Sequence, residues 1–220
     1  MNTVLEGAFE KTFVVFLLGS LGSMVTITNP LSKIPLFLTL TRDMDEAARR
    51  QQARRACIYS FAILTVSLFG GVFILQGFGI SYGALRIAGG MTIALIGYRM
   101  LFHGPDVRFA GEHGRSDVAF FPLALPSISG PGSIAVVIGI STEIAELQQG
   151  FQRVLAYFAT VFSIFLTCLL IWLTMRSAQV VSRLIGEGGM DALSRLMGFL
   201  LVCIGVQFVA SGIRSFLSGA

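Results

Sequence analysis

Long uncharged stretches alternate with short charged segments along the whole chain. Between charged residues, the stretches 12–32, 56–85, 118–142, 154–175 and 196–213 hold 21, 30, 25, 22 and 18 residues. A helix needs about 20 apolar residues to cross the hydrocarbon core of a bilayer. The pattern therefore predicts several membrane-spanning helices.

Six helices fit these stretches once the longest stretch is divided. The division is expected at 76–79, because Gln-Gly-Phe-Gly is typical of a turn. The predicted fold is all-α: a polytopic membrane protein that forms a single membrane domain over residues 1–220. The expected spans are about 12–40, 55–77, 84–102, 118–142, 153–175 and 192–214.

Composition strengthens this interpretation and excludes other classes. Only 13% of the residues are charged and 54% are hydrophobic, whereas soluble domains carry roughly 25% charged residues. A soluble enzyme, a disordered chain and a secreted disulfide scaffold are thereby excluded. The net charge of +4 does not indicate nucleic-acid binding, because the arginines lie in short segments between spans and form no basic patch on a polar surface.

Lysine and arginine fall mostly on one side of the predicted spans. Ten of them lie in the odd-numbered loops: Arg42, Arg49, Arg50, Arg54, Arg55, Arg99, Arg108, Arg115, Arg176 and Arg183. The opposite side has Lys11, Arg153 and Arg214. Cytoplasmic loops are enriched in basic residues, so we expect a multi-pass protein with its odd-numbered loops in the cytoplasm and both termini outside.

The first basic segment is expected to extend the second span as a helix. Asp43 and Glu46 have the spacing of a capping box. Glu46 also has the spacing to pair with Arg49 and Arg50 along a helix. Contact of this arginine cluster with anionic lipid is a compatible second role.

Cysteine and histidine give no sign of metal or redox chemistry. Cys57, Cys168 and Cys203 lie inside apolar stretches without a C-x-x-C spacing, so we expect buried free thiols. His103 and His113 lie in a polar, Gly-rich segment without ligand-like spacing. We expect no metal, no cofactor and no enzymatic activity.

Three short matches recur in order along the chain and indicate an internal duplication. The matched ranges are 27–32 with 128–133, 55–59 with 153–157, and 84–97 with 192–205, at offsets of 101, 98 and 108. The predicted repeats are about 1–103 and 118–220, joined by a cytoplasmic linker at about 103–117. Because each repeat has three spans, the second must enter the membrane from the opposite face, as in many secondary transporters. Chance similarity of Gly-, Ala- and Leu-rich spans is the alternative.

Two proline motifs stand at equivalent positions of these repeats. Proline removes a helical hydrogen bond and pushes the preceding residue toward an extended conformation, so the first and fourth spans are expected to be broken. Freed backbone groups are costly in lipid unless they are buried in protein or line a watery cavity. A half-helix N-terminus can receive a carboxylate, and unwound carbonyls can accept from an ammonium group. Simple kinks are the alternative, since Pro and Gly are frequent in membrane helices.

The candidate substrate-binding residues flank both breaks, where hydroxyl groups and glycines suit a small zwitterionic solute. They are Thr28, Asn29, Pro30 and Ser32 in the first repeat, and Ser129, Gly130, Pro131, Gly132 and Ser133 in the second. Of the few charges inside the spans, Lys33 is the best functional candidate, because it can hold freed carbonyls or a substrate carboxylate. Arg86 and Arg195 are candidate gate residues, with snorkelling to headgroups as the alternative.

Glycines recur at roughly heptad spacing on the third and sixth spans. They include Gly83, Gly90 and Gly97 on one span and Gly198 and Gly205 on the other. Small residues let membrane helices approach closely. We interpret these glycines as a seam along which the two halves slide or hinge.

Four segments carry a resemblance to a known family. They are TNPLSKIPLFL, LRIAGGMTIALIGYRMLF, FFPLALPSISGPGSIA and DALSRLMGFLLVCIGVQF, and they resemble the MarC family of bacterial inner-membrane proteins. The resemblance implies inverted three-helix repeats of the LysE-like exporter group and a substrate site framed by Asn29-Pro30 and Gly130-Pro131-Gly132. It further implies export of small neutral amino acids such as glycine and alanine, as in SnatA-type transporters.

Two function classes follow from these observations. The first is a secondary transporter of a small zwitterionic solute in the lipid bilayer. The second is a channel or a non-transporting membrane scaffold. A homo-oligomer is compatible with both.

Overall fold

The computed structural model describes residues 2–103, 118–148 and 150–217, and all the regular secondary structure in this part of the chain is helical. His103 lies at the end of a helix, whereas the rest of the predicted linker, with His113, lies outside the described residues. The elements are α1 (Asn2–Thr28), the short 3₁₀ turn η1 (Pro30–Ser32), α2 (Lys33–Leu40), α3 (Glu46–Gly77), α4 (Tyr82–His103), the π-helical segment η2 (Ala119–Ile128), α5 (Pro131–Glu146) and α6 (Gly150–Leu217).

The lengths and apolarity of these helices fit a polytopic membrane protein. Five described segments are long and apolar enough to cross a membrane: Thr12–Leu38, Glu46–Gly77, Tyr82–Phe102, Gly150–Val181 and Asp191–Leu217. A sixth is added if η2 and α5, which are bent by 59° relative to each other, count as one span. The prediction of an all-helical membrane fold is therefore confirmed, with five or six candidate spans where six were predicted.

The predicted turn between the second and third spans is confirmed. Helix α3 ends at Gly77 and α4 begins at Tyr82. Between them Gly79 has a φ of 64°, a left-handed conformation that costs glycine little because it has no Cβ.

The prediction of a loop between the last two spans is wrong. Helix α6 continues through the polar segment that carries Arg176 and Arg183, and its one residue with non-helical dihedrals is Gly186, with φ 71° and ψ 174°. Arginine is a good helix former, so a charged segment can stay helical. Only the glycine interrupts α6, and we call its two sides the first and second parts of α6.

The cap of α3 also differs from expectation. Asp45, not Asp43, is the N-cap residue, and its carboxylate accepts a hydrogen bond of 2.7 Å from the Ala48 amide. Asp45 has the extended backbone that an N-cap residue needs. The sequence spacing alone did not separate these two aspartates.

Only one of the two predicted ion pairs at the start of α3 forms. Arg50 pairs with Glu46 one turn away. Arg49 instead donates through Nε to the Thr41 carbonyl and through Nη2 to the Arg42 carbonyl, both at 2.8 Å. Its guanidinium therefore ties the end of α2 to α3.

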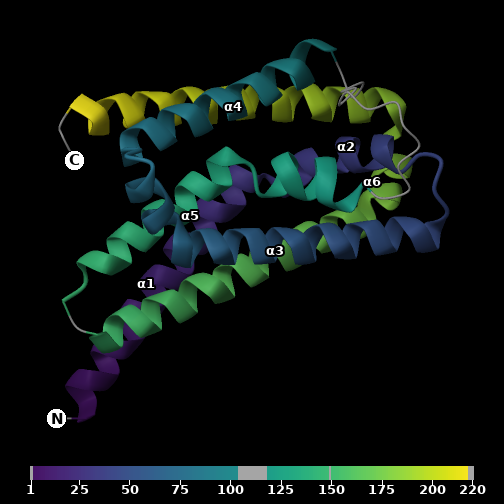
Figure 1. The fold of residues 1–220 in the computed structure, drawn as a ribbon. Coiled ribbons are helices and arrows are strands. Elements are labelled where there is room, and N and C mark those ends of the chain that lie inside the picture. The colour runs from purple at the N-terminus through teal and green to yellow at the C-terminus, as the bar shows by residue number, and fades with distance from the viewer. Residues whose placement is uncertain (1, 104–117, 149, 218–220) are drawn as a thin grey trace.

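The helices form three layers, as Figure 1 shows: α4 runs beside the second part of α6, α3 runs near the first part of α6, and α2, η2 and α5 lie between them. One buried cluster joins α3, η2 and the first part of α6, with Leu64, Leu123 and Ile171 among its members. A second joins α1, α4 and the second part of α6 through Ile27 and Ile93, among others. The middle layer therefore lies between two apolar clusters.

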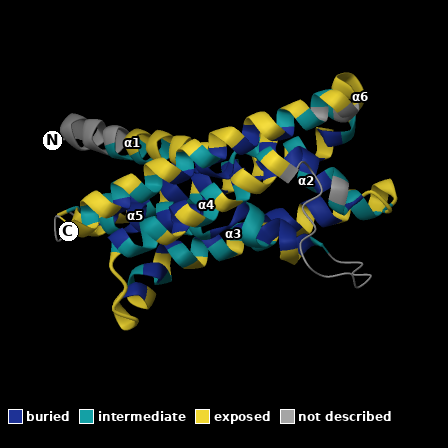
Figure 2. Ribbon diagram, turned by 90° about the horizontal axis from the view of Figure 1, so that it is seen from above, coloured by how far each residue is buried: buried dark blue, intermediate teal, exposed yellow. Residues whose placement is uncertain are grey.

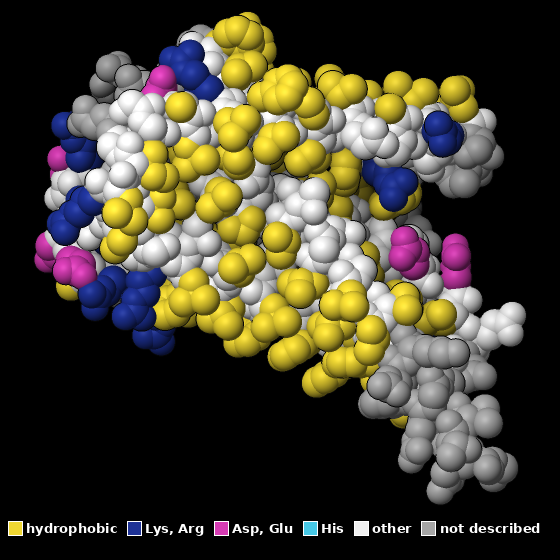
Figure 3. Space-filling model, turned by 180° about the vertical axis from the view of Figure 1, so that it is seen from behind, with side chains coloured by type: hydrophobic (Ala, Val, Ile, Leu, Met, Phe, Trp, Pro, Cys, Tyr) yellow, Lys and Arg dark blue, Asp and Glu magenta, His cyan; other side chains and the backbone are white. Residues whose placement is uncertain are grey.

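The surface is inverted relative to a soluble protein. Buried residues lie toward the centre of the bundle and exposed ones on its outside (Figure 2), and the exposed residues include many large apolar ones, such as Val66 and Phe73. Charged side chains gather toward the two ends of the molecule, and hydrophobic ones cover the region between them (Figure 3).

Inside the protein, buried hydroxyl groups form hydrogen bonds between helices: Ser20 Oγ lies 2.9 Å from Ser163 Oγ. Such hydrogen bonds help helices to associate in lipid, where apolar burial between helices contributes little.

The connections between helices and the described ends of the chain lie at different ends of the molecule. The α2–α3 connection, the end of α4 and the bend in α6 lie at one end, and the described ends near the two termini lie at the other (Figure 1). The segments rich in arginine therefore share one end of the molecule.

The glycines of α4 and α6 pack against each other in an antiparallel row. Gly83 faces Gly212, and the next two pairs are Gly90 with Gly205 and Gly97 with Gly198. A Cβ built on Gly90 would lie 2.6 Å from the Gly205 carbonyl oxygen, so the backbones themselves are in contact. The close approach predicted from the heptad spacing is confirmed. We call these pairs the glycine seam.

Substituting Gly90 with Ala should destabilise the protein. The added methyl group meets backbone that cannot move away, and such overpacking costs about 1–3 kcal/mol. Gly70→Ala is the matched control, because a Cβ at Gly70 meets nothing within 4 Å. Thermal unfolding in detergent should show a lower midpoint for Gly90→Ala alone. Equal midpoints for the two variants would contradict the seam.

Candidate functional site

The chain leaves helical geometry at Asn29, between α1 and α2. Asn29 has φ 42° and ψ 82°, and asparagine is one of the few residues that enter the left-handed region readily. Pro30 follows as the first residue of η1, where its missing N–H costs least. The Asn29 side chain donates from Nδ2 to Met197 Sδ on α6 at 3.3 Å.

A second departure from helical geometry lies between η2 and α5. Leu125, directly before Pro126, is extended with φ −116° and ψ 129°, as expected for a residue that precedes proline. Gly130 is also extended, with ψ 173°, and α5 begins at Pro131. A Cβ on Gly130 would clash with the Pro126 carbonyl oxygen. The close approach of these two backbone segments therefore requires glycine.

Lys33 connects the two departures. Its side chain is 7% exposed, and its Nζ donates a hydrogen bond of 2.6 Å to the carbonyl oxygen of Ser127, 94 residues along the chain. Lys33 is the first residue of α2, and Ser127 belongs to η2. Lys33, the best functional candidate among the charges inside the spans, thus bonds a carbonyl in the other interrupted segment.

A small cavity lies where the two interrupted segments meet α4 and α6. Its volume is about 60 Å³, and one water needs about 10–15 Å³ on this measure. The cavity therefore has room for a solute of a few heavy atoms. We call it the central cavity. Its lining is Ile27, Ser32, Lys33, Pro35, Leu36, Thr92, Ile93, Ile96, Met100, Pro126, Ser127, Gly130, Pro131, Gly132, Ser133, Ser194 and Leu201.

The structure brings some of the sequence-predicted site residues to this cavity. Ser32, Gly130, Pro131, Gly132 and Ser133 line it, together with Lys33. Two of these hydroxyls also hold the bends: Ser32 donates to the Asn29 carbonyl at 2.7 Å, and Ser133 donates to the Ile128 carbonyl at 2.8 Å.

The other predicted residues lie outside the lining. Thr28 donates its hydroxyl to the Met24 carbonyl at 2.7 Å, and Ser129 donates to the Ser60 carbonyl at 3.3 Å. Asn29 and Pro30 also lie off the lining. Equivalent positions in the two repeats therefore do not place all these side chains on the cavity: the Thr28 hydroxyl bonds its own helix α1, and the Ser129 hydroxyl bonds α3.

Sequence reasoning missed the part of the lining that α4 and α6 contribute. Thr92 on α4 and Ser194 on α6 are its hydroxyl residues. Ser194 is 0% exposed, and its Oγ has no hydrogen-bond partner among the described residues. Neither residue adjoins a proline motif, so only the packing of distant helices reveals them.

A larger, open pocket lies beside the central cavity. It has a volume of about 480 Å³ and shares the Ile27 side chain with the central cavity. Arg86 and Glu143 are its charged lining residues. Figure 3 shows the molecule hollowed at one end, with Lys or Arg on one side of the hollow and Asp or Glu on the other. We call this pocket the vestibule.

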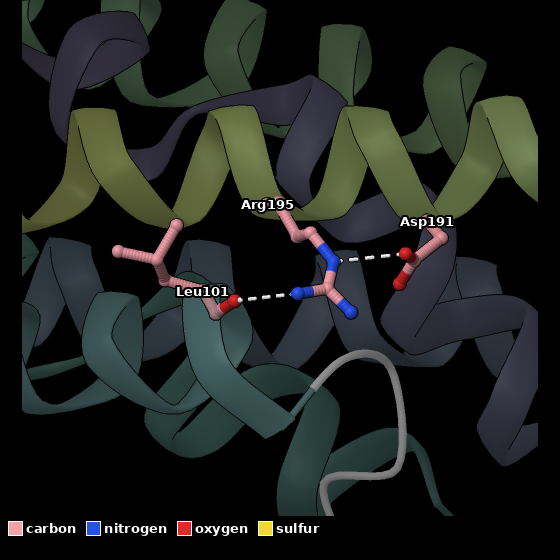
Figure 4. Close-up of polar contacts among 3 residues, drawn as sticks. All are labelled: Leu101, Asp191 and Arg195. Atoms are coloured by element: carbon pink, nitrogen blue, oxygen red, sulfur yellow. Dashed lines mark hydrogen bonds and ion pairs between the residues drawn. The ribbon is translucent and has the colours of Figure 1, made fainter.

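The two candidate gate arginines have different surroundings. The Arg86 guanidinium lies over the Tyr82 ring, 4.5 Å from its centroid, on the vestibule wall. Arg195 bonds Asp191 at 2.8 Å through Nε and reaches the Leu101 carbonyl at 3.4 Å through Nη1 (Figure 4). Arg195 thus contacts the last turns of α4 and does not line the central cavity.

The cysteines are partly as expected. Cys57 and Cys168 are buried, but Cys203 is exposed, so the expectation that all three are buried is wrong. Its apolar surroundings in the sequence are those of a side chain that faces lipid. Among the described residues no group of three metal-binding side chains comes together.

The known proteins that this chain resembles are membrane proteins. Residues 14–217 match the model of the family described as MarC family integral membrane protein. The chain is 40% identical over 200 residues to the inner membrane protein MarC of Escherichia coli strain K12, and equally to that of Shigella flexneri. These alignments cover 86% of this chain and 90% of each relative. No solved structure matches significantly.

Cysteine labelling should separate the vestibule from the helix interfaces. In a Cys203→Ser background, Thr26→Cys places a thiol on an exposed residue of the vestibule. Ser163→Cys, at a fully buried position, is the matched control. A membrane-impermeant thiol reagent should modify the first variant and leave the second unmodified until the protein is denatured. Equal rates of modification would contradict the vestibule.

Proposed function

The chain belongs to the MarC family of integral membrane proteins, and from this premise we propose that it is a secondary transporter of small neutral amino acids. The direction proposed is export from the cytoplasm, without chemical change of the solute. The observation that carries the proposal is a central cavity of about 60 Å³ at the meeting point of two interrupted helical segments. That volume suits glycine or alanine.

We propose that the interrupted segments are broken spans whose backbone holds the solute. The start of α5, with Pro131, Gly132 and Ser133, lies on the cavity, and a helix start offers N–H groups and a positive dipole to a carboxylate. The Ser127 carbonyl offers an acceptor for an ammonium group. Both ends of a zwitterion therefore have partners.

An inverted duplication is supported by the pairing in the glycine seam. At the offset of 108 residues, Gly90 corresponds to Gly198 and Gly97 to Gly205. In the structure Gly90 contacts Gly205, and Gly97 contacts Gly198. Such exchange of equivalent partners is what a two-fold axis produces. We propose that the axis relates repeats at about 1–103 and 118–220.

Alternating access follows from this symmetry. With the arginine-rich end in the cytoplasm and both termini in the periplasm, the vestibule opens outward, and Ile27 stands between it and the central cavity. At the cytoplasmic end, Arg195 holds α6 to the Leu101 carbonyl of α4. Opening inward would break this contact while the glycine seam slides.

A channel or a non-transporting scaffold is the alternative. A channel needs a continuous aqueous path. The buried Ile27 side chain lines both the central cavity and the vestibule, and we propose that it blocks such a path, which favours a carrier.

Counterflow in proteoliposomes tests the proposal. Liposomes loaded with unlabelled alanine should accumulate labelled alanine and glycine. Gly130→Ala should reduce the initial rate at least about tenfold, because the methyl group clashes with the Pro126 backbone and a small displacement of a binding geometry has effects of this size or larger. Gly70→Ala, with open space around its Cβ, should transport like the unmodified chain.

Monodisperse protein that shows neither counterflow nor a ligand-induced rise in its thermal midpoint would refute the transporter proposal. Equal counterflow by both glycine variants would instead place the transport path away from the interrupted segments.

A further inference from the structure

Lys33 is a buried cation without a counter-ion among the described residues. An ammonium group has three N–H donors, and the one hydrogen bond that the Lys33 side chain makes within the described part of the chain goes to the Ser127 carbonyl. The lining of the central cavity contains no Asp or Glu side chain. A buried charge is costly unless it is paired. The lining is therefore complementary to a small anion.

Ser194 adds an unsatisfied hydroxyl to the same lining. Its side chain is fully buried, and its Oγ lacks a partner among the described residues. A hydroxyl can donate one hydrogen bond and accept two, and a buried polar atom left unpaired costs about 1–3 kcal/mol. Since Ser194 comes from α6 and Lys33 from α2, the two unsatisfied groups reach the central cavity from different layers.

The start of α5 is the third donor group. The first N–H groups of a helix have no partner within the helix, and Gly132 and Ser133 lie in the first turn of α5, a helix of 16 residues. Both line the central cavity. Lys33, Ser194 and the positive end of α5 therefore all line the same cavity.

We infer that the central cavity is a carboxylate site that works by exchange. The Lys33 ammonium leaves the Ser127 carbonyl and bonds the carboxylate of the solute, and the Ser194 hydroxyl donates to the same carboxylate. The freed Ser127 carbonyl accepts a hydrogen bond from the ammonium group of the solute. This inference rests on the proposed function for the identity of the solute as an amino acid. The requirement for a carboxylate concerns binding only and can be tested without measuring transport.

The exchange explains how one cavity selects for both charges of a zwitterion. With no solute bound, the Lys33 ammonium donates one of its hydrogen bonds to the Ser127 carbonyl, at 2.6 Å. A solute with only an ammonium group would leave Lys33 without an acceptor, and one with only a carboxylate would leave the Ser127 carbonyl without a donor. An α-amino acid carries both groups on the same carbon, Cα, and therefore replaces both halves of the bond.

Only the first of the two repeats has a lysine at this position. The position equivalent to Lys33, at the offset of 101 residues, is Ile134. The solute is therefore bound in a single orientation, with its carboxylate toward α2. Ser194 distinguishes the two halves in the same way, because position 86, at the offset of 108, is an arginine on the vestibule wall.

Binding measurements on the purified full-length protein in detergent test the inference. The probes are glycine, glycinamide, acetate, methylamine and sodium chloride, each followed by the shift of the thermal midpoint with concentration. Glycine should bind tightest and acetate more weakly. Glycinamide and methylamine, which lack the carboxylate, should bind at least about tenfold more weakly than glycine, the loss expected for one charge-assisted hydrogen bond.

Variants identify the groups responsible. Lys33→Gln should weaken glycine binding about tenfold or more and remove the preference for glycine over glycinamide. Lys33→Arg keeps the charge and should restore part of that preference. Ser194→Ala should weaken glycine binding severalfold, a smaller effect because a neutral donor is lost. Ser177→Ala, an exposed hydroxyl on the first part of α6, is the matched control and should bind like the unmodified chain.

Three results would overturn the inference. The first is that the unmodified protein binds glycinamide as tightly as glycine. This test does not depend on whether a variant folds. The second is Lys33→Gln protein that keeps the preference for glycine. The third is protection by chloride equal to that by glycine, because the cavity would then be a site for an inorganic anion. In the first two cases counterflow of alanine could still succeed, so failure of the inference is distinguishable from failure of the proposed function.

Discussion

The structure depends on one constraint: inside a bilayer, every backbone N–H and C=O must find a partner within the protein. Two helical segments depart from regular geometry, at Asn29 and at Gly130. Both departures lie in the middle layer, where protein covers them on both sides. The Lys33 side chain bonds the Ser127 carbonyl, so a group from the first interruption satisfies backbone of the second. A cavity at the meeting point is the consequence, because unwound chain packs less densely than helix.

The outer layers make this arrangement stable. In the glycine seam α4 and α6 touch through backbone, and the Ile, Met and Leu side chains of the second cluster pack beside them. The first cluster joins α3 to the first part of α6 through close apolar packing. The lipid-facing surfaces stay apolar, and hydroxyl pairs such as Ser20 with Ser163 hold helices together from within. These outer layers enclose the middle layer, which carries the non-helical backbone at Asn29 and Gly130.

Sequence reasoning predicted the parts of this structure that periodicity and special residues determine. The spans, the turn near Gly79 and the close approach of the glycines all follow from local chemistry. The N-cap at Asp45, the helical continuation up to Gly186 and the exposure of Cys203 do not, because neighbouring sequence allows several outcomes. For the site, the proline motifs indicated the region. They did not indicate which hydroxyls face the cavity, since the lining from α4 and α6 depends on how distant helices pack.

The central claim is that a solute occupies the cavity between the two interrupted segments. An experimental structure determined with saturating alanine tests it most directly. The density for alanine should lie between Lys33 and Gly132, with the Lys33 side chain turned away from the Ser127 carbonyl. Alanine bound only in the vestibule beside Arg86, with the central cavity unoccupied and the Lys33 bond intact, would contradict the claim.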